Sequence, residues 1–370
     1  MSFNHPLIEF DKPVFFPGEE VTGKVSMNVE KDQTARKVEI SFTGKTVTAW
    51  SPDGKVEKVK RSGAFEKSQE KFLEMKHEVW QPEDEANTFP AGEYEWNFSF
   101  ELPKQCPPSF EGCYGHIRYS VFVSVDVPKW LDNEAEKAVT VSPSIDLNTI
   151  AGAQNDVEFK AEKEMEACGC MPIFNFAPFR RGTVTFTYTT PTLGFVSGAD
   201  IPLSGIVHNS TNKAIEGLTA KLLQRVIYRQ DLSTLNAIKV KNDIDFNAKT
   251  VNLQLADSYE SVEIPVGDSK PFNFTLQIPP TVATIRSEQF LSVEYFVAVT
   301  AEFDSKWCAS ATADMNILIG NVPFSDPERD GLTSHHFEKG AAAECWTSHM
   351  SDEFRPQFPY YGTVKTVEPQ

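Results

Sequence analysis

The sequence predicts an all-β protein built from two tandem, immunoglobulin-like antiparallel β-sandwiches, followed by a short, mobile C-terminal tail. Two observations carry this prediction: apolar and polar residues alternate along most of the chain, and the second half repeats the first. With 370 residues, of which 40% are hydrophobic, the chain also has enough length and apolar material for two cores.

Apolar residues occupy every second position in many segments, as expected for strands with one buried face. In the first half this pattern covers residues 21–29, 38–42, 94–102 and 119–127, and in the second half residues 184–188, 272–278 and 293–303. Residues 64–77 are rich in Glu, Lys and Gln and by propensity alone could form a helix. The strands around them favour a charged loop that leads into an edge strand near residues 72–79.

The two halves match each other in order and spacing. Asn97, Phe98, Pro103, Tyr119, Val121 and Val123 have counterparts at Asn273, Phe274, Pro279, Tyr295, Val297 and Val299, each 176 positions later (for example 273 − 97). Gly18 and Gly198 stand before the first long strand of each half, where we expect a turn that needs a positive φ. This repeat predicts the same architecture for both halves.

The repeat and the composition divide the chain into four parts. We expect an N-terminal sandwich over residues 1–150, a linker over 151–181, a C-terminal sandwich over 182–324 and a tail over 325–370. The linker is charged and then rich in Phe, and the tail begins where the alternation ends and Pro and Gly follow.

Charge and cysteine usage indicate a cytoplasmic chain. The formal net charge of −17 repels nucleic acid, so nucleic acid is not an expected partner. The six cysteines do not follow the spacing of a disulfide scaffold, and the sequence begins without a secretory signal, so we expect reduced thiols. No apolar run is long enough to span a bilayer, which predicts no direct membrane insertion.

The most distinctive segment is the run from Phe100 to Val123. It contains Leu102, Pro103, Pro107, Pro108, Ser109, Phe110, Glu111, Gly112, Gly115, Ile117, Arg118 and Tyr119 in a characteristic order. With Phe16, Pro17, Gly18 and Glu19 near the start and Ile319, Gly320 and Pro323 near residue 320, this run resembles the α-arrestins, or arrestin-domain-containing proteins, which include the thioredoxin-interacting protein. The resemblance covers residues 5–324 and implies the arrestin fold.

The resemblance implies a non-enzymatic adaptor that binds cytoplasmic segments of membrane receptors or transporters. Such adaptors direct endocytosis, endosomal sorting or ubiquitination, and are recruited from the cytoplasm to the plasma membrane and endosomes. Many α-arrestins present Pro-Pro-x-Tyr motifs to the WW domains of ubiquitin ligases. Here the corresponding tail segment is degenerate, since Phe358 replaces the first proline, leaving Pro359 and Tyr361 as a weak candidate partner-binding motif. A plain tail turn is the alternative.

Other functions remain open from the sequence alone. A retromer-type sorting subunit in a stable complex would share the two-sandwich fold. A thiol-dependent enzyme could use Cys113 with His116, or Cys168 with Cys170, and the tail holds zinc-ligand types at irregular spacing in His335, His336, Cys345 and His349. No phosphate-loop, dinucleotide-binding or nucleophile-elbow pattern occurs. We therefore expect no catalytic residue, cofactor or metal.

Overall fold

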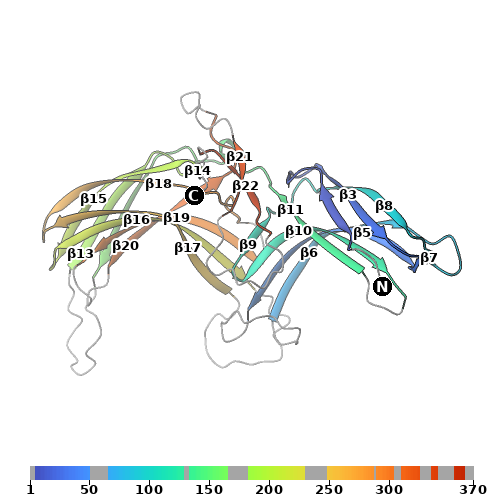
Figure 1. The fold of residues 1–370 in the computed structure, drawn as a ribbon. Coiled ribbons are helices and arrows are strands. Elements are labelled where there is room, and N and C mark those ends of the chain that lie inside the picture. Colours follow the sequence, from blue (N-terminus) through green and yellow to red (C-terminus); the bar gives the residue numbers. More distant parts are fainter. Residues whose placement is uncertain are drawn as a thin grey trace, which may run out of the picture.

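The computed structural model describes residues 5–50, 66–128, 133–165, 182–229, 248–286, 289–303, 310–325, 335–340 and 354–362. Two β-sandwiches lie side by side, and the described part of the tail lies in the region between them (Figure 1). The one helix among the described residues is the three-residue turn η1 (Leu147–Thr149), which is far too short to cross a membrane.

The N-terminal sandwich consists of two sheets. One sheet has the order β1-β3-β8, with β1 (Leu7–Phe10), β3 (Glu20–Val29) and β8 (Gly92–Glu101). The other has the order β2-β11-β10-β5-β6, with β2 (Val14–Phe15), β11 (Asn133–Val141), β10 (Gly115–Asp126), β5 (Lys37–Trp50) and β6 (Glu66–Trp80). The short strand β9 (Phe110–Gly112) pairs with β10, and β4 (Gln33–Thr34) pairs with β7 (Thr88–Phe89).

The C-terminal sandwich has a similar design, with one more strand in its first sheet. One sheet has the order β12-β13-β15-β18, with β12 (Val157–Glu164), β13 (Gly182–Thr190), β15 (Asp200–Thr211) and β18 (Ser269–Gln277). The other has the order β14-β20-β19-β16-β17, with β14 (Gly194–Val196), β20 (Ala311–Gly320), β19 (Leu291–Glu302), β16 (Ile215–Arg229) and β17 (Ala248–Ile264).

The repeat predicted from the sequence is confirmed by the strand orders. The sheet β2-β11-β10-β5-β6 corresponds strand for strand to β14-β20-β19-β16-β17, and in each the two-to-three-residue first strand pairs in parallel with its neighbour. Tyr119 and Tyr295 are fully buried on the corresponding strands β10 and β19. Gly18 and Gly198 adopt φ angles of 83° and 93°, so the predicted positive φ is present at both turns.

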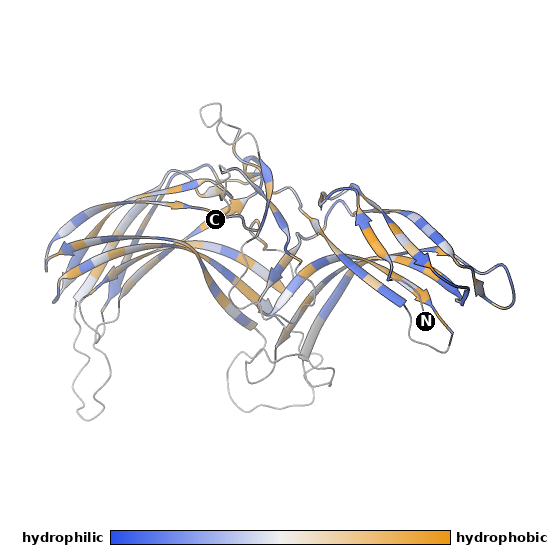
Figure 2. Ribbon diagram, viewed as in Figure 1, coloured by the Kyte–Doolittle hydropathy of each residue, from blue (hydrophilic) through white to orange (hydrophobic). Residues whose placement is uncertain are grey.

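The apolar residues that alternate with polar ones along the strands are the residues buried in the two cores. On β3, for example, Val21 and Val25 are fully buried while Lys24 between them is partly exposed. Figure 2 shows this as hydrophobic and hydrophilic residues that alternate along the strands of both sandwiches. The all-β prediction is therefore confirmed, and the ambiguous segment at residues 64–77 contributes to the edge strand β6 rather than to a helix.

Two segments outside the predicted sandwiches differ from expectation. Within the expected linker, β12 pairs with β13 and belongs to the C-terminal sandwich, because Val157, Phe159 and Ala161 turn one side of this strand to the core. Within the expected mobile tail, the described residues form β21 (His336–Lys339) and β22 (Gln357–Tyr360), an antiparallel pair packed on the body of the protein. The tail packs because its aromatic residues gain burial there.

Candidate functional site

The junction between the two sandwiches begins with the chain that leaves β11. The Ile145 N–H donates to the Asn321 side-chain oxygen at 2.5 Å, and the Asn321 side-chain amide donates to the Pro143 carbonyl oxygen at 2.5 Å. The Asn321 N–H in turn donates to the Ile145 carbonyl oxygen at 3.1 Å. One asparagine just beyond β20 thus holds the connection between the domains through both its side chain and its backbone.

A second contact joins the ends of β5 and β10 to the ends of β16 and β17. The Thr48 hydroxyl donates to the Arg229 carbonyl oxygen at 2.7 Å. The rings of Tyr114 and Tyr228 meet edge to face at 5.7 Å between centroids, and the Lys249 ammonium lies 4.0 Å from the Tyr114 ring centroid. Burial raises the pKa of the Tyr228 hydroxyl above its ordinary value. These contacts make the junction a packed interface rather than a single tether.

A buried ion pair stands on the N-terminal side of the junction. The Arg118 Nε donates to the Glu111 carboxylate at 2.8 Å, and their side chains are only 11% and 4% exposed. Loss of water raises the pKa of Glu111, and the Arg118 charge acts in the opposite direction. In the sequence both residues looked like parts of a scaffold motif, although a charged residue between Ile117 and Tyr119 on a buried strand could have signalled a paired charge.

The tail closes this junction by bonding to both domains. The Gln357 N–H donates to the Thr140 hydroxyl of the N-terminal sandwich at 3.1 Å. On the other side, the Tyr361 N–H donates to the Ser197 carbonyl oxygen at 2.9 Å, and its hydroxyl donates to the Asn321 carbonyl oxygen at 2.9 Å. The Phe354 ring lies 5.7 Å from the Arg118 guanidinium carbon. The tail therefore acts as a bridge across the junction.

The candidate partner-binding residues Pro359 and Tyr361 lie inside this bridge. Pro359 is buried, and Phe358 and Tyr361 are 9% and 8% exposed. Phe358 and Pro359 also line a small enclosed space together with residues of both domains, among them Val141 and Thr281. A WW domain grips proline and tyrosine side chains in open aromatic slots, so this arrangement keeps both residues from such a partner.

The candidate thiol and zinc residues are only partly described. Cys113 is disulfide-bonded, which differs from the expected reduced thiols. Cys168, Cys170, Cys345 and His349 also lie outside them. His335 packs against the Tyr361 ring, and the His336 Nε2 lies 3.0 Å from a Glu338 carboxylate oxygen. In the part of the chain that is described, no three His, Cys, Asp or Glu residues gather as a metal site would require.

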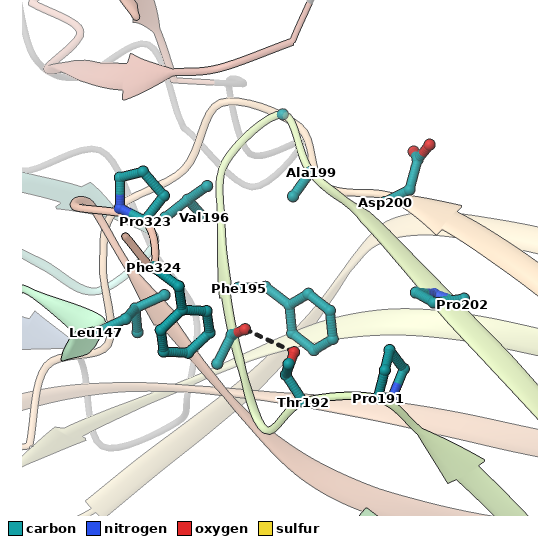
Figure 3. Close-up of a pocket in the computed structure, with 12 residues that line it drawn as sticks. Leu147, Pro191, Thr192, Phe195, Val196, Ala199, Asp200, Pro202, Pro323 and Phe324 are labelled. Atoms are coloured by element: carbon teal, nitrogen blue, oxygen red, sulfur yellow. Dashed lines mark hydrogen bonds between the residues drawn. The ribbon is translucent and has the colours of Figure 1, made fainter. Parts of the chain in front are cut away.

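An apolar pocket opens beside the bridge on the C-terminal sandwich. Its volume is about 340 Å³, and Figure 3 shows Phe195, Pro323 and Phe324 around it with Asp200 at its edge. The Thr192 hydroxyl donates to the Gly194 carbonyl oxygen at 3.0 Å and so bonds within the wall. The pocket lining is mostly apolar and includes one carboxylate. Such a lining suits ligand binding rather than acid–base chemistry.

Comparison with known families and proteins agrees with this architecture. The family model described as "Arrestin (or S-antigen), N-terminal domain" matches residues 6–148, and "Arrestin (or S-antigen), C-terminal domain" matches residues 180–324. Arrestin domain-containing protein 17 of Caenorhabditis elegans is 25% identical over 341 residues, which cover 87% of this chain and 70% of that protein.

Two further relatives show how the similarity is distributed. Arrestin domain-containing protein 4 of Homo sapiens is 23% identical over 326 residues, covering 85% of this chain and 70% of that protein. Arrestin domain-containing protein 1 of Mus musculus is 29% identical over 143 residues, which cover 38% of this chain and 31% of that protein.

Two sandwiches of similar design, which are joined by a packed junction and matched by the two arrestin family models, define an arrestin-type protein. The chain belongs to the arrestin family, as a member of its branch of arrestin-domain-containing proteins, the α-arrestins. The resemblance seen in the sequence is thereby confirmed.

Proposed function

We propose that this chain is an adaptor that binds cytoplasmic segments of membrane receptors or transporters and directs their endocytosis or endosomal sorting. The observation that supports it is the complete pair of arrestin domains, matched over residues 6–148 and 180–324 and held by one packed junction. Its place of action is the cytoplasm, with recruitment to the plasma membrane and endosomes.

We propose no catalytic step for this adaptor, because the polar groups at the junction already serve to hold the two domains. Arg118 is engaged by Glu111, and Asn321 by the backbone of the connecting segment. These buried contacts are satisfied internally, as structural groups are. We therefore expect the membrane-protein partner to bind the outer surface of the sandwiches.

Ubiquitin-ligase recruitment would follow only after the tail leaves the junction. Pro359 and Tyr361 become accessible to a WW domain when the Tyr361 bonds to Ser197 and Asn321 break. A peptide of residues 354–362 is then expected to bind a WW domain at least about tenfold more tightly than the full chain, because the chain must first release the segment. Fluorescence anisotropy with the peptide and its Tyr361→Ala variant measures this, and equal affinity of chain and peptide would show that burial does not limit access.

The adaptor function is tested by capture from crosslinked cells with the full-length chain. The expected result is enrichment of receptors or transporters over a tag-only control, together with endosomal proteins. Capture of exclusively soluble partners would contradict the proposal. Elution of the native chain as a fixed subunit of one large complex would instead favour a retromer-type role.

A further inference from the structure

The longest described strand pairs on one side only with other described residues. Strand β17 comprises 17 residues and stands last in the order β14-β20-β19-β16-β17. Its described pairing is with β16 alone, over Ile215–Arg229. In Figure 1, β17 borders the C-terminal sandwich, and its first residues lie at the junction. An unpaired strand border presents a row of N–H and C=O groups that an extended segment can join.

The half of β17 nearest the junction also has an incompletely covered apolar row. Val262 and Ile264 at the far end are 5% and 1% exposed. Val251, Leu253 and Leu255, on the same side of the strand, are only partly buried. A segment with alternating apolar residues would cover this row if it paired along β17, since alternate side chains of an added strand point to the same side.

The charge along β17 divides it into two unlike halves. From Thr250 to Ala256 the strand carries no charged residue, whereas from Asp257 to Ile264 it carries three carboxylates, Asp257, Glu260 and Glu263, and no base. A matching segment therefore carries Lys or Arg opposite the second half and apolar residues opposite the first.

The other long border strand carries lysines along its length, whereas the one lysine of β17, Lys249, lies near the beginning of the strand beside the Tyr114 ring. Strand β6 carries Lys71 and Lys76, whose ammonium groups pair with carboxylates at 3.0 and 3.2 Å. Lysines and prolines on border strands oppose the addition of further strands. Between Thr250 and Ile264, β17 contains no Lys, Arg or Pro. Its border is thus suited to accept a partner.

We propose that β17 is a docking edge for an extended cytoplasmic segment in which a basic cluster precedes alternating apolar residues, added antiparallel to β17. Antiparallel addition places the basic cluster against the three carboxylates and the apolar residues against Val251, Leu253 and Leu255. Cytoplasmic segments that directly follow a membrane span begin with Lys and Arg, so this order suits the cargo of the proposed adaptor, and in this respect the inference rests on that function.

A second copy of the chain is a poorer occupant than a basic segment. The formal net charge of −17 opposes the approach of two copies, and antiparallel pairing of two β17 strands would leave the carboxylates of both without a counter-charge. Self-association is therefore an outcome to be tested and not the expected one.

The test uses the full chain and a labelled peptide of about ten residues, with three basic residues followed by valines alternating with threonines. Leu253→Lys places a charge in the apolar row and is expected to weaken binding by about tenfold or more. Thr250→Lys is the matched control, since it adds the same charge on the opposite, exposed side of the strand, and it should change binding by less than about twofold. Thermal unfolding checks that both variants fold.

A second variant keeps the test decisive if Leu253→Lys does not fold. Replacing Asp257, Glu260 and Glu263 by their amides is expected to weaken binding at low salt and to flatten its salt dependence. A peptide of reversed order and a peptide interrupted by proline should bind weakly. Equal binding of all peptides, equal effects of the two lysine variants, binding to anionic vesicles in place of peptide, or a dimer broken by Leu253→Lys would each overturn the proposal.

Cell capture separates this inference from the adaptor function. If the wild-type chain captures membrane proteins and the Leu253→Lys variant captures the same set, the docking edge is wrong while the adaptor function stands. If the wild type captures no membrane protein, the adaptor function falls, and the peptide measurements still decide whether β17 accepts a strand.

Discussion

The Tyr361 hydroxyl donates a hydrogen bond to the Asn321 carbonyl oxygen at 2.9 Å. Asn321 also holds the connection between the sandwiches through its side chain. The end of the tail is thus bonded to the residue that joins the two domains. We therefore expect release of the tail to loosen the contact between Asn321 and the segment that connects the two domains.

Tyr361→Phe is expected to loosen the tail while leaving both sandwiches folded. Loss of one buried hydrogen bond costs about 1 kcal/mol, so amide hydrogen exchange at Gln357 and Tyr361 should accelerate roughly fivefold. Tyr360→Phe is the control, because the partly exposed Tyr360 ring contacts His336 at the surface. Equal exchange in the two variants would show that the Asn321 bond does not hold the tail.

Gly198→Ala tests the contact between the tail and the C-terminal sandwich. A Cβ on Gly198 would lie 2.1 Å from the Gly362 nitrogen and 2.8 Å from the Tyr361 nitrogen. Gly18→Ala is the matched control, since Gly18 has a similar φ and its added Cβ would lie 3.7 Å from Lys104 Cγ. Both changes carry about 1 kcal/mol of backbone strain, and only Gly198→Ala should also displace the tail.

Thermal unfolding and proteolysis of the tail measure the difference between these glycine variants. We expect faster cleavage of the tail in Gly198→Ala alone. In a chain ending at residue 353, the two substitutions should become equally destabilising. If Gly198→Ala stayed more destabilising than Gly18→Ala in the shortened chain, the extra loss of stability would not come from the tail.

Arg118→Met removes one partner of the buried ion pair. It leaves the Glu111 charge in a site that is nearly closed to water, so the free energy of unfolding should fall by about 3–5 kcal/mol at neutral pH. The double variant Glu111→Gln, Arg118→Met removes both charges and should recover much of this loss. Urea unfolding measures both, and a double variant no more stable than Arg118→Met would contradict the charge explanation.

The same variant should also change how stability depends on pH. Burial raises the pKa of Glu111 in the folded protein, and without Arg118 nothing in the pair offsets that rise. The folded state then binds more protons than the unfolded state, so stability falls as the pH rises through the folded pKa. The deficit of Arg118→Met relative to wild type should therefore shrink as the pH is lowered from neutral, and a deficit independent of pH would contradict this cause.

Tyr119 and Tyr295 provide a comparison within the repeat. The Tyr119 hydroxyl donates to the Pro107 carbonyl oxygen at 2.7 Å, and the Tyr295 hydroxyl donates to that of Val282 at 2.6 Å. Tyr295 also accepts from the Gln224 amide at 2.8 Å. Tyr295→Phe deprives both the Val282 carbonyl oxygen and the Gln224 amide of this hydroxyl, so it should lower the free energy of unfolding by about 2–3 kcal/mol. A loss of about 1 kcal/mol or less in urea unfolding would show that the Gln224 bond adds nothing.

The sequence predicted the sandwiches well because the relevant signals are local or repeated. Alternation at residues 21–29 and 293–303 reports which side of a strand is buried, and the match between Tyr119 and Tyr295 reports the shared strand order. The linker was expected to be longer than it is, since the alternation in β12 extends over only three apolar residues, Val157, Phe159 and Ala161.

The candidate site was less predictable because its partners lie far apart in the chain. Gln357 and Thr140 are separated by 217 residues, and neither has a pattern that points to the other. Pro359 and Tyr361 stood out as a motif in an expected mobile tail, and only packing against two domains at once explains their burial.

The sequence by itself determined the all-β class, the duplicated sandwich, the two turns with positive φ and the resemblance to α-arrestins, because each depends on residues close together or on a repeat. The tertiary structure alone decided that the tail bridges the junction from Thr140 to Asn321, and that β17 is the last strand of its sheet among the described residues. Contacts between distant segments arise from how two finished domains pack, and the burial of an aromatic tail residue depends on a surface that exists only after both have folded.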